Sequence, residues 1–157
     1  MANIEIAPAQ INDVLFRFLQ SVYLFEKREQ SLFDVSWDEV YLLQLLVRQH
    51  PMTVSELAEK LKVKTFTASR MITRLSSQNL VIREPAADDR RRVKVSITPY
   101  GLEKIRQIEA FNYHTILSNI HTLGDMEIRT LMKSIEKLED LLGLHPWKGE
   151  ETNELGE

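Results

Sequence analysis

The side chains with the clearest chemical capacity in this sequence are cationic, and they cluster between Thr53 and Thr98. That stretch holds ten lysines and arginines against five acidic residues, a net charge of +5. The rest of the chain carries −8, so the formal charge of the 157-residue chain is only −3. An asymmetry of this kind favours a local anionic partner, which the total charge conceals.

Two short helices joined by a tight turn are predicted inside the cationic stretch. Thr53 and Glu56 form a capping box that opens the first of them. The second begins at Lys64 or Thr65 and ends near Asn79, and both show apolar residues at helical spacing. This pattern predicts a helix-turn-helix, although its turn lacks the common glycine. The second helix of such a motif lies in the DNA major groove.

The outward face of the second helix carries polar and cationic side chains that suit DNA. Arginine can donate two hydrogen bonds to guanine, and serine or threonine can contact bases or phosphates. The alternative, a merely solvated face, is weakened because no acidic residue occurs from Lys60 to Arg83. Phe66 has two interpretations, contact with a thymine methyl or packing beside the first helix. The residues expected to contact DNA from this helix are Lys64, Thr65, Phe66, Thr67, Ser69, Arg70, Thr73 and Arg74.

Two strands joined by a charged loop are predicted next, at about 80–84 and 92–98. In the second strand Val93, Val95 and Ile97 alternate with polar residues, as in a half-buried strand. A hairpin in this place makes a winged helix, and an arginine-rich tip can enter a neighbouring minor groove. Asp89 is expected to fold back and hold one of the arginines of this loop in place. The expected wing residues are Asp89, Arg90, Arg91 and Arg92, against the alternative of an exposed loop without a role.

Amphipathic helices are predicted on both sides of this lobe, over about 9–30, 36–49, 99–123 and 125–142, the last capped by Asp125. A small winged lobe cannot cover all their apolar faces, and burial against a symmetric copy would resolve this. The predicted fold class is mainly α (α+β). Its parts are a winged helix-turn-helix DNA-binding domain at 36–98, helical dimerisation regions at 9–35 and 99–142, and a flexible acidic tail at 143–157.

The stretch from Asp89 to Gly101, Asp-Arg-Arg-Arg-Val-Lys-Val-Ser-Ile-Thr-Pro-Tyr-Gly, resembles the wing signature of the multiple-antibiotic-resistance regulator (MarR) family. That signature is Asp-x-Arg, a short alternating strand, Leu-Thr and a glycine, and Ile97 stands where leucine is usual. Residues 53–58 and 75–81 also resemble that family's helix-turn-helix and its exit into the wing. The order of predicted elements matches the family over most of the chain.

The resemblance implies a homodimeric transcription regulator, usually a repressor, whose two winged helices bind a pseudo-palindromic site in double-stranded DNA. It implies release from DNA when a small lipophilic or phenolic effector binds between the dimer helices and the DNA-binding lobe. It also implies that Asp89 and Arg91 are the wing's aspartate and groove-inserting arginine. Aromatic residues on the bordering helices are candidate ligand contacts, although plain core packing is the simpler interpretation of each. They are Tyr23, Trp37, Tyr41, Phe111 and Tyr113.

Other chemistry has little support in the sequence. There is no cysteine, which excludes disulfides and thiolate sites. No glycine-rich phosphate loop or nucleophile motif occurs, so neither an enzyme nor a cofactor is expected. His114 and His121 are seven residues apart on one predicted helix, a loose spacing for a metal, and no metal is expected. Short apolar runs and a beginning without a signal segment lead us to expect no membrane span and a cytoplasmic protein.

Two further hypotheses stay open at this stage. The first is a winged helix that binds another protein and no DNA, which the acidic flanks allow. The second is regulation by a metal through His114 or His121, which a chelator would test.

Overall fold

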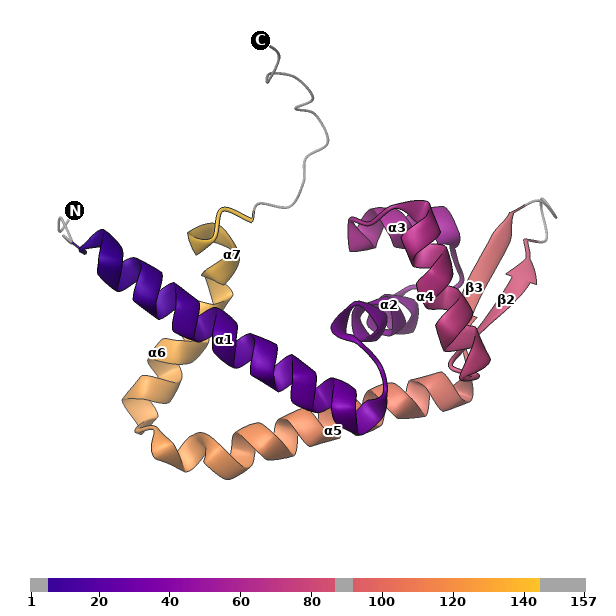
Figure 1. The fold of residues 1–157 in the computed structure, drawn as a ribbon. Helices are drawn as coiled ribbons and strands as arrows, with labels where there is room; N and C mark the ends of the chain where they lie inside the picture. Colours follow the sequence, from indigo (N-terminus) through magenta and orange to yellow (C-terminus); the bar gives the residue numbers. More distant parts are fainter. Residues whose placement is uncertain (1–5, 87–91, 145–157) are drawn as a thin grey trace, which may run out of the picture. The chain divides into compact units, whose positions relative to one another are not determined.

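The computed structural model describes residues 6–86 and 92–144 (Figure 1). Its helices are α1 (Pro8–Phe33), α2 (Trp37–Arg48), α3 (Val54–Leu61), α4 (Thr65–Ser77), α5 (Pro99–Asn119), α6 (Asp125–Glu136) and α7 (Leu138–Leu141). A 3₁₀ turn, η1 (Ile120–Thr122), follows α5, and the strands are β1 (Met52–Thr53), β2 (Val81–Pro85) and β3 (Val93–Ile97). The predicted fold class, a mainly helical winged helix-turn-helix with flanking helices, is confirmed.

The chain divides into two compact units, Met1–Phe111 and Asn112–Glu157. The first contains the elements from α1 to β3 and the first half of α5. The second contains the rest of α5 with η1, α6 and α7. This division differs from the expected DNA-binding and dimerisation segments. Those segments were assigned by function, and their functions stay a prediction.

Capping boxes start α2 and α3, and the box at α3 is the predicted one. The Ser36 N–H donates to Glu39 Oε2 at 2.8 Å, and the Glu39 N–H donates to Ser36 Oγ at 3.3 Å. At α3, the N–H and the hydroxyl of Thr53 both donate to Glu56 Oε2, at 2.7 and 2.8 Å. These bonds pair groups that the ends of helices leave unsatisfied. The turn before α4 needs no glycine, because Lys62 itself adopts the left-handed backbone conformation, with φ 54°.

The sheet is antiparallel and has the order β1-β3-β2, so β3 is its central strand. Strands β2 and β3 pair from Val81 opposite Ile97 to Pro85 opposite Val93, which confirms the predicted hairpin. Strand β1 was not expected. It pairs Met52 with Val95, and a strand of two residues has no alternating pattern that a sequence could reveal.

The core of the winged lobe joins α2, α3, α4, the sheet and the first half of α5. Its members are aliphatic side chains that lie almost wholly out of contact with water, which is the main stabilising contribution in a lobe of this size. The largest of them are Leu42, Leu43, Leu46, Leu57, Ile72, Leu75, Leu80, Ile105 and Ile108.

A compact group of hydrogen bonds joins the start of β2 to the start of α5. The Thr98 hydroxyl donates to the carbonyl of Asn79 at 2.6 Å and accepts from the N–H of Gly101 at 2.9 Å. The Thr98 N–H donates to the carbonyl of Leu80 at 3.0 Å. Thr98 therefore caps α5 and also holds the exit of the helix-turn-helix. Gly101 lies directly against Leu80, where a Cβ would stand 2.1 Å from the carbonyl oxygen.

The C-terminal helices end earlier than predicted. Helix α5 ends at Asn119, not near 123, and the Asn119 side chain there donates to the carbonyl of Thr115 at 2.7 Å. The chain continues from Asn119 into the 3₁₀ turn η1. The cap of α6 is Gly124, not Asp125, and the predicted single last helix is interrupted between α6 and α7 at Lys137.

Helices α1 and α6 expose apolar side chains. Over the first half of α1 every residue is exposed, including the predicted apolar stripe, whereas its last turn is anchored by Phe33, which packs on the core. Glu29 is the one buried residue of α1, and its Oε1 has no hydrogen-bond partner within residues 6–86 and 92–144. On α6 the exposed apolar residues are Met126, Leu131, Met132 and Ile135.

In the ranges that the structure describes, the helices are all too short or too polar to cross a bilayer.

We expect Gly101→Ala to lower the free energy of unfolding by more than about 3 kcal/mol, because the new methyl would collide with backbone that cannot rotate away. Gly124→Ala is the matched control, since its Cβ would make only an ordinary contact, 3.5 Å from Glu127 Oε2. Its cost should stay within about 1 kcal/mol. Urea denaturation of both variants measures the difference, and equal losses would contradict the assigned collision.

The pKa of Glu56 lies below its ordinary value of 4.5, chiefly because its carboxylate accepts from the backbone and hydroxyl of Thr53. A carboxyl whose pKa is lower in the folded state stabilises the fold above its unfolded pKa and loses that effect as pH falls through the folded pKa. Glu56→Gln should therefore cost less than about 1 kcal/mol at pH 7. The cost should shrink as pH falls below about 4.5.

Unfolding free energies of wild type and Glu56→Gln between pH 7 and pH 3 test this. Glu59→Gln removes the same charge from the same helix and is the control, for which we expect no such convergence. A Glu56→Gln cost that is constant with pH would contradict the capping role of the carboxylate.

Candidate nucleic-acid interface

Helix α4 presents one face to the core and the opposite face to solvent. Ala68, Ile72 and Leu75 are fully buried, at the helical spacing that the sequence predicted, and Met71 is partly buried beside them. Because 3.6 residues make one turn, these positions leave a stripe on the far side of the helix that contains Phe66, Arg70 and Thr73. All three of these side chains are exposed.

The first turn of α4 has little internal bonding of its side chains. Lys64 is the N-cap residue and makes no side-chain capping bond. In the described part of the chain, Arg70 has no hydrogen-bond or ion-pair partner, and the same is true of the side chains of Lys64 and Thr65. The helix therefore turns two unpaired cations and several small polar groups toward solvent, with no carboxylate among them.

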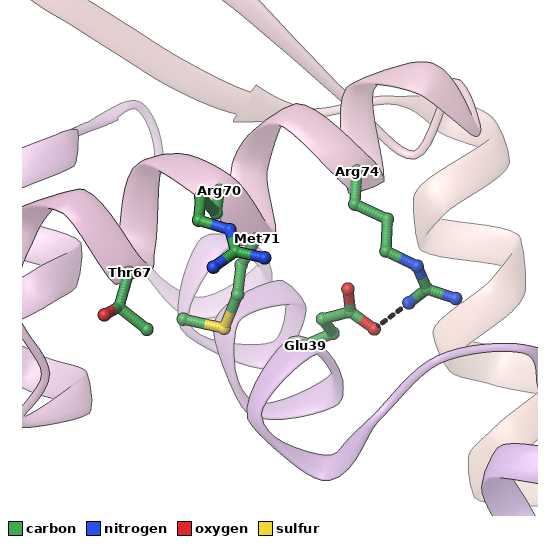
Figure 2. A pocket seen from close by; sticks show the side chains of 5 residues that line it. All are labelled: Glu39, Thr67, Arg70, Met71 and Arg74. Carbon is green, nitrogen blue, oxygen red and sulfur yellow. Dashed lines mark hydrogen bonds and ion pairs between the residues drawn. The ribbon is translucent and has the colours of Figure 1, made fainter.

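Arg74, one of the expected DNA contacts, has partners within the protein. Its partly exposed guanidinium is paired: Nη1 donates to Glu39 Oε2 (Figure 2), and Nη2 donates to Asp34 Oδ1 at 2.8 Å. The Glu39 side chain is only 4% exposed, so it depends on this cation for compensation. Gln78 adds a bond from Nε2 to Asp34 Oδ2 at 2.9 Å.

The electrostatic effect on Arg74 agrees with this geometry. The hydrogen bond to Glu39 is the largest cause that raises the pKa of Arg74 above its ordinary value, and the carboxylates of Glu39 and Asp34 add to it. Arg74 thus anchors α4 to the turn between α1 and α2. Helical spacing predicts that Arg74 lies one turn after Arg70. It does not predict that the carboxylates of Asp34 and Glu39 pair with Arg74.

Arg83 is a residue that the sequence analysis passed over. Its Nη2 donates to the carbonyl of Ser69 and to the hydroxyl of Thr73, both at 2.8 Å. The Thr73 hydroxyl in turn donates to the Ser69 carbonyl at 2.9 Å. Arg83 therefore fixes β2 to the middle of α4, and Thr73 uses its hydroxyl inside the protein. In the sequence, Arg83 is only a cation within a predicted strand, and this position alone does not predict its bonds with α4.

A hollow of about 290 Å³ opens between α2 and α4. Figure 2 shows the residues that line it, which are Glu39, Thr67, Arg70, Met71 and Arg74. Arg70 reaches over its mouth, whereas Arg74 is tied down at the other end by Glu39 (Figure 2). Two arginines four residues apart on one helix thus have different surroundings.

The base of the wing is well defined. Strands β2 and β3 pair up to Pro85 and Val93, and the Ala86 N–H donates to the carbonyl of Arg92 at 2.8 Å. Arg92 is exposed, and with Lys94 it exerts an attraction on Glu56 that lowers the pKa of that carboxyl further. The predicted tip residues Asp89, Arg90 and Arg91 lie outside the described residues.

The five candidate ligand contacts have separate surroundings. Phe111 meets Phe33 edge to face, with 5.6 Å between ring centroids, and Arg28 lies 5.3 Å above the Phe111 ring. Tyr23 is exposed beneath Lys27, Trp37 and Tyr41 are exposed on α2, and Tyr113 is exposed beside His114. Phe111 is thus half-buried between neighbouring side chains, whereas the other four aromatic side chains are exposed.

His114 and His121 are not on one helix, since α5 ends before His121, which lies in η1. Across residues 6–86 and 92–144, no group of three or more histidine and acidic side chains is arranged to hold a metal ion.

Comparisons with known proteins agree with this arrangement. The model of the MarR family matches residues 35–93. The HTH-type transcriptional repressor MdtR of Bacillus subtilis is 30% identical over 96 residues, which are 61% of this chain and 60% of that protein. The HTH-type transcriptional regulator YsmB of the same organism is 29% identical over 97 residues, 62% of this chain and 66% of that protein. The chain thus spans somewhat less than two thirds of the length of these relatives.

Solved structures share the fold over nearly their whole length. RV1404 from Mycobacterium tuberculosis superposes with a TM-score of 0.73 at 20% identity, over 92% of this chain and 99% of that chain. FabT of Streptococcus pneumoniae, solved in complex with DNA, superposes with a TM-score of 0.70 at 22% identity, over 87% and 98%. The family match begins just before α2, takes in the helix-turn-helix with its capping boxes, and ends in β3, so the similarity of this chain to the MarR family lies in the winged helix-turn-helix.

Proposed function

We propose that this protein is a sequence-specific DNA-binding transcription regulator, and that the outward face of α4 reads its operator. The observation that carries the proposal is the state of Arg70. It lies exposed in the middle of that face, without an internal partner in the described ranges, while the neighbouring Arg74 and Arg83 are both engaged. An arginine held available in this way can form a bidentate contact with guanine in the major groove.

The other expected contacts on α4 divide into two groups. Lys64, Thr65 and Thr67 keep their side chains available for phosphates or base edges, which fits the way recognition helices use their first turns. Arg74 and Thr73 have internal partners, and we assign them to holding the helix. Ser69 supplies its carbonyl to Arg83 and keeps its hydroxyl as a candidate contact.

The wing is proposed as a second point of contact. Its stem is built and carries Arg92 and Lys94, and the succession Asp89-Arg90-Arg91 at the tip supplies further cations. Arginines that enter a narrow minor groove respond to its concentrated negative potential. We assign the arginines to that groove, and Asp89 to holding one of them in place.

Repression as a homodimer is proposed on two further grounds. A relative that shares 30% identity, MdtR, is named as a repressor. The exposed apolar faces of α1 and α6 suit burial against a second copy, which would set two α4 helices against a pseudo-palindromic site.

Release by a small lipophilic or phenolic effector is proposed as the signal. The exposed aromatic rings of Tyr23, Trp37 and Tyr41 offer apolar contact area with a polar atom at one end of each side chain. Loss of operator binding on addition of salicylate or a similar phenolic acid, measured by fluorescence anisotropy, is the corresponding experiment.

The two neighbouring arginines should behave differently when each is replaced by alanine. Arg70→Ala should weaken operator binding at least about fivefold and leave thermal unfolding unchanged, because Arg70 has no hydrogen-bond or ion-pair partner in the described ranges. Arg74→Ala should lower the free energy of unfolding by about 1–3 kcal/mol, because it leaves the buried Glu39 carboxylate without its partner. Calorimetry and anisotropy on both variants measure the two effects.

Salt dependence separates DNA binding from a protein-interaction role. Specific affinity should fall by about 10³ or more between 50 and 200 mM salt if several phosphates are neutralised. The operator fragments for this measurement are selected from random-sequence duplexes or taken from the protein's own promoter. Absence of DNA binding at low salt would refute the proposed function and favour an interaction module.

Sedimentation should give a particle of twice the chain mass of 18.3 kDa. Ile135→Glu puts a charge on the exposed apolar face of α6 and should shift the equilibrium toward monomer by at least about tenfold. Thr130→Glu puts the same charge on the opposite side of that helix and is the control. A wild-type monomer at micromolar concentration would refute the dimer.

A further inference from the structure

Phe66 occupies a position that its chemistry does not explain within this chain. It is the second residue of α4, and 61% of its surface is exposed. Single exposed apolar residues are common and need no explanation by themselves. What sets Phe66 apart is its place on the polar, cation-bearing face described above, between Thr65 and Arg70.

The helix geometry excludes packing of Phe66 into the core. The buried positions Ala68, Ile72 and Leu75 lie on one side of α4, and Phe66 lies at nearly the opposite point of the circumference. Arg70 follows it by four residues and Thr73 by seven, so the three form one outward stripe. Of the two interpretations of Phe66 that the sequence left open, this exposed placement outside the core supports contact with DNA.

The ring also has no aromatic or cationic partner among residues 6–86 and 92–144, where the ring contacts lie elsewhere, at Phe33 with Phe111, at Tyr113 and at Tyr23. A benzyl side chain that offers no hydrogen bond gains free energy only by excluding water from another apolar group. Within the major groove, the apolar group that projects from a base edge is the C5-methyl of thymine.

We propose that Phe66 is a specificity-determining residue that contacts a thymine C5-methyl in each half-site. The inference rests on the proposed function of α4 and adds the base that one position reads. The first turn of a recognition helix is the part that contacts base edges. Lys64, at the N-cap, stands next to it as a phosphate partner, and Arg70 stands one turn further along the same stripe. Phe66 thus requires a thymine close to the base that Arg70 contacts.

The experiment removes the methyl group and nothing else. Binding sites are selected from random-sequence duplexes with the full-length chain, and each thymine of a selected half-site is replaced singly by deoxyuridine. Deoxyuridine keeps every hydrogen-bonding group of thymine, so only apolar contact is lost. Affinities are measured for wild type, Phe66→Ala, Phe66→Leu and Tyr100→Ala. Tyr100, on the first turn of α5, is a comparably exposed aromatic outside the proposed interface and serves as the control.

For wild type, replacing the one contacted thymine of a single half-site by deoxyuridine should weaken binding about fourfold, the value expected for one buried methyl. Phe66→Ala should bind the thymine site more weakly and show no further loss with deoxyuridine, while Phe66→Leu should keep at least about a twofold loss. Tyr100→Ala should match wild type. The dependence of affinity on salt should stay the same in all variants, because none changes a charge.

Several results would overturn the inference while leaving the proposed function intact. In the first, deoxyuridine at no thymine of a selected site lowers the affinity of wild type. In the second, deoxyuridine lowers the affinity of Phe66→Ala as much as that of wild type at every thymine. Unchanged operator affinity of Phe66→Ala would assign the ring to another contact, such as a protein partner, and would also overturn it. Failure to select any duplex would remove the proposed function and the inference together.

Discussion

The bond between Arg74 and the buried Glu39 carboxylate is the interaction on which the functional surface of this protein depends. Glu39 also accepts from the Ser36 N–H, and Asp34 accepts from both Arg74 and Gln78. One small group of charges therefore starts α2, closes the turn after α1 and anchors the C-terminal half of α4. Without it the C-terminal half of α4 would keep its apolar contacts, which are not directional, and would lose its charged link to the turn after α1.

The second support of α4 comes from the other side of the motif. Arg83 reaches from β2 to the Ser69 carbonyl and the Thr73 hydroxyl, and the bonds of Thr98 with Asn79 and Gly101 hold the start of β2 against α5. Between these supports, α4 has an outer face on which Lys64 and Arg70 make no hydrogen bond or ion pair with other described residues. The net charge of −3 hides this arrangement, because the cationic lobe and the acidic flanks cancel in the sum.

Much of this could be predicted from particular residues. Ser36 with Glu39 and Thr53 with Glu56 marked the starts of two helices, because a capping box depends only on residues three apart. Ala68, Ile72 and Leu75 marked the buried side of α4, and the alternation of Val93, Val95 and Ile97 marked the central strand. The ends of helices were less predictable. Helix α5 passes into the 3₁₀ turn η1 after Asn119, and the apolar spacing does not distinguish a 3₁₀ turn from a continuing α-helix.

The sequence by itself determined the elements, their order and the sign of charge on the lobe, since these follow from short-range spacing and composition. Only the tertiary structure decided which cations of α4 are paired within the protein and which are left for an outside partner. Arg70 and Arg74 look equivalent as letters four apart, yet residues 35 and 40 positions earlier in the chain neutralise one of them and leave the other exposed. Strand β1 and the need for glycine at position 101 were decided in the same way. Each depends on a contact between segments distant in sequence, and such a contact exists only once the chain has folded.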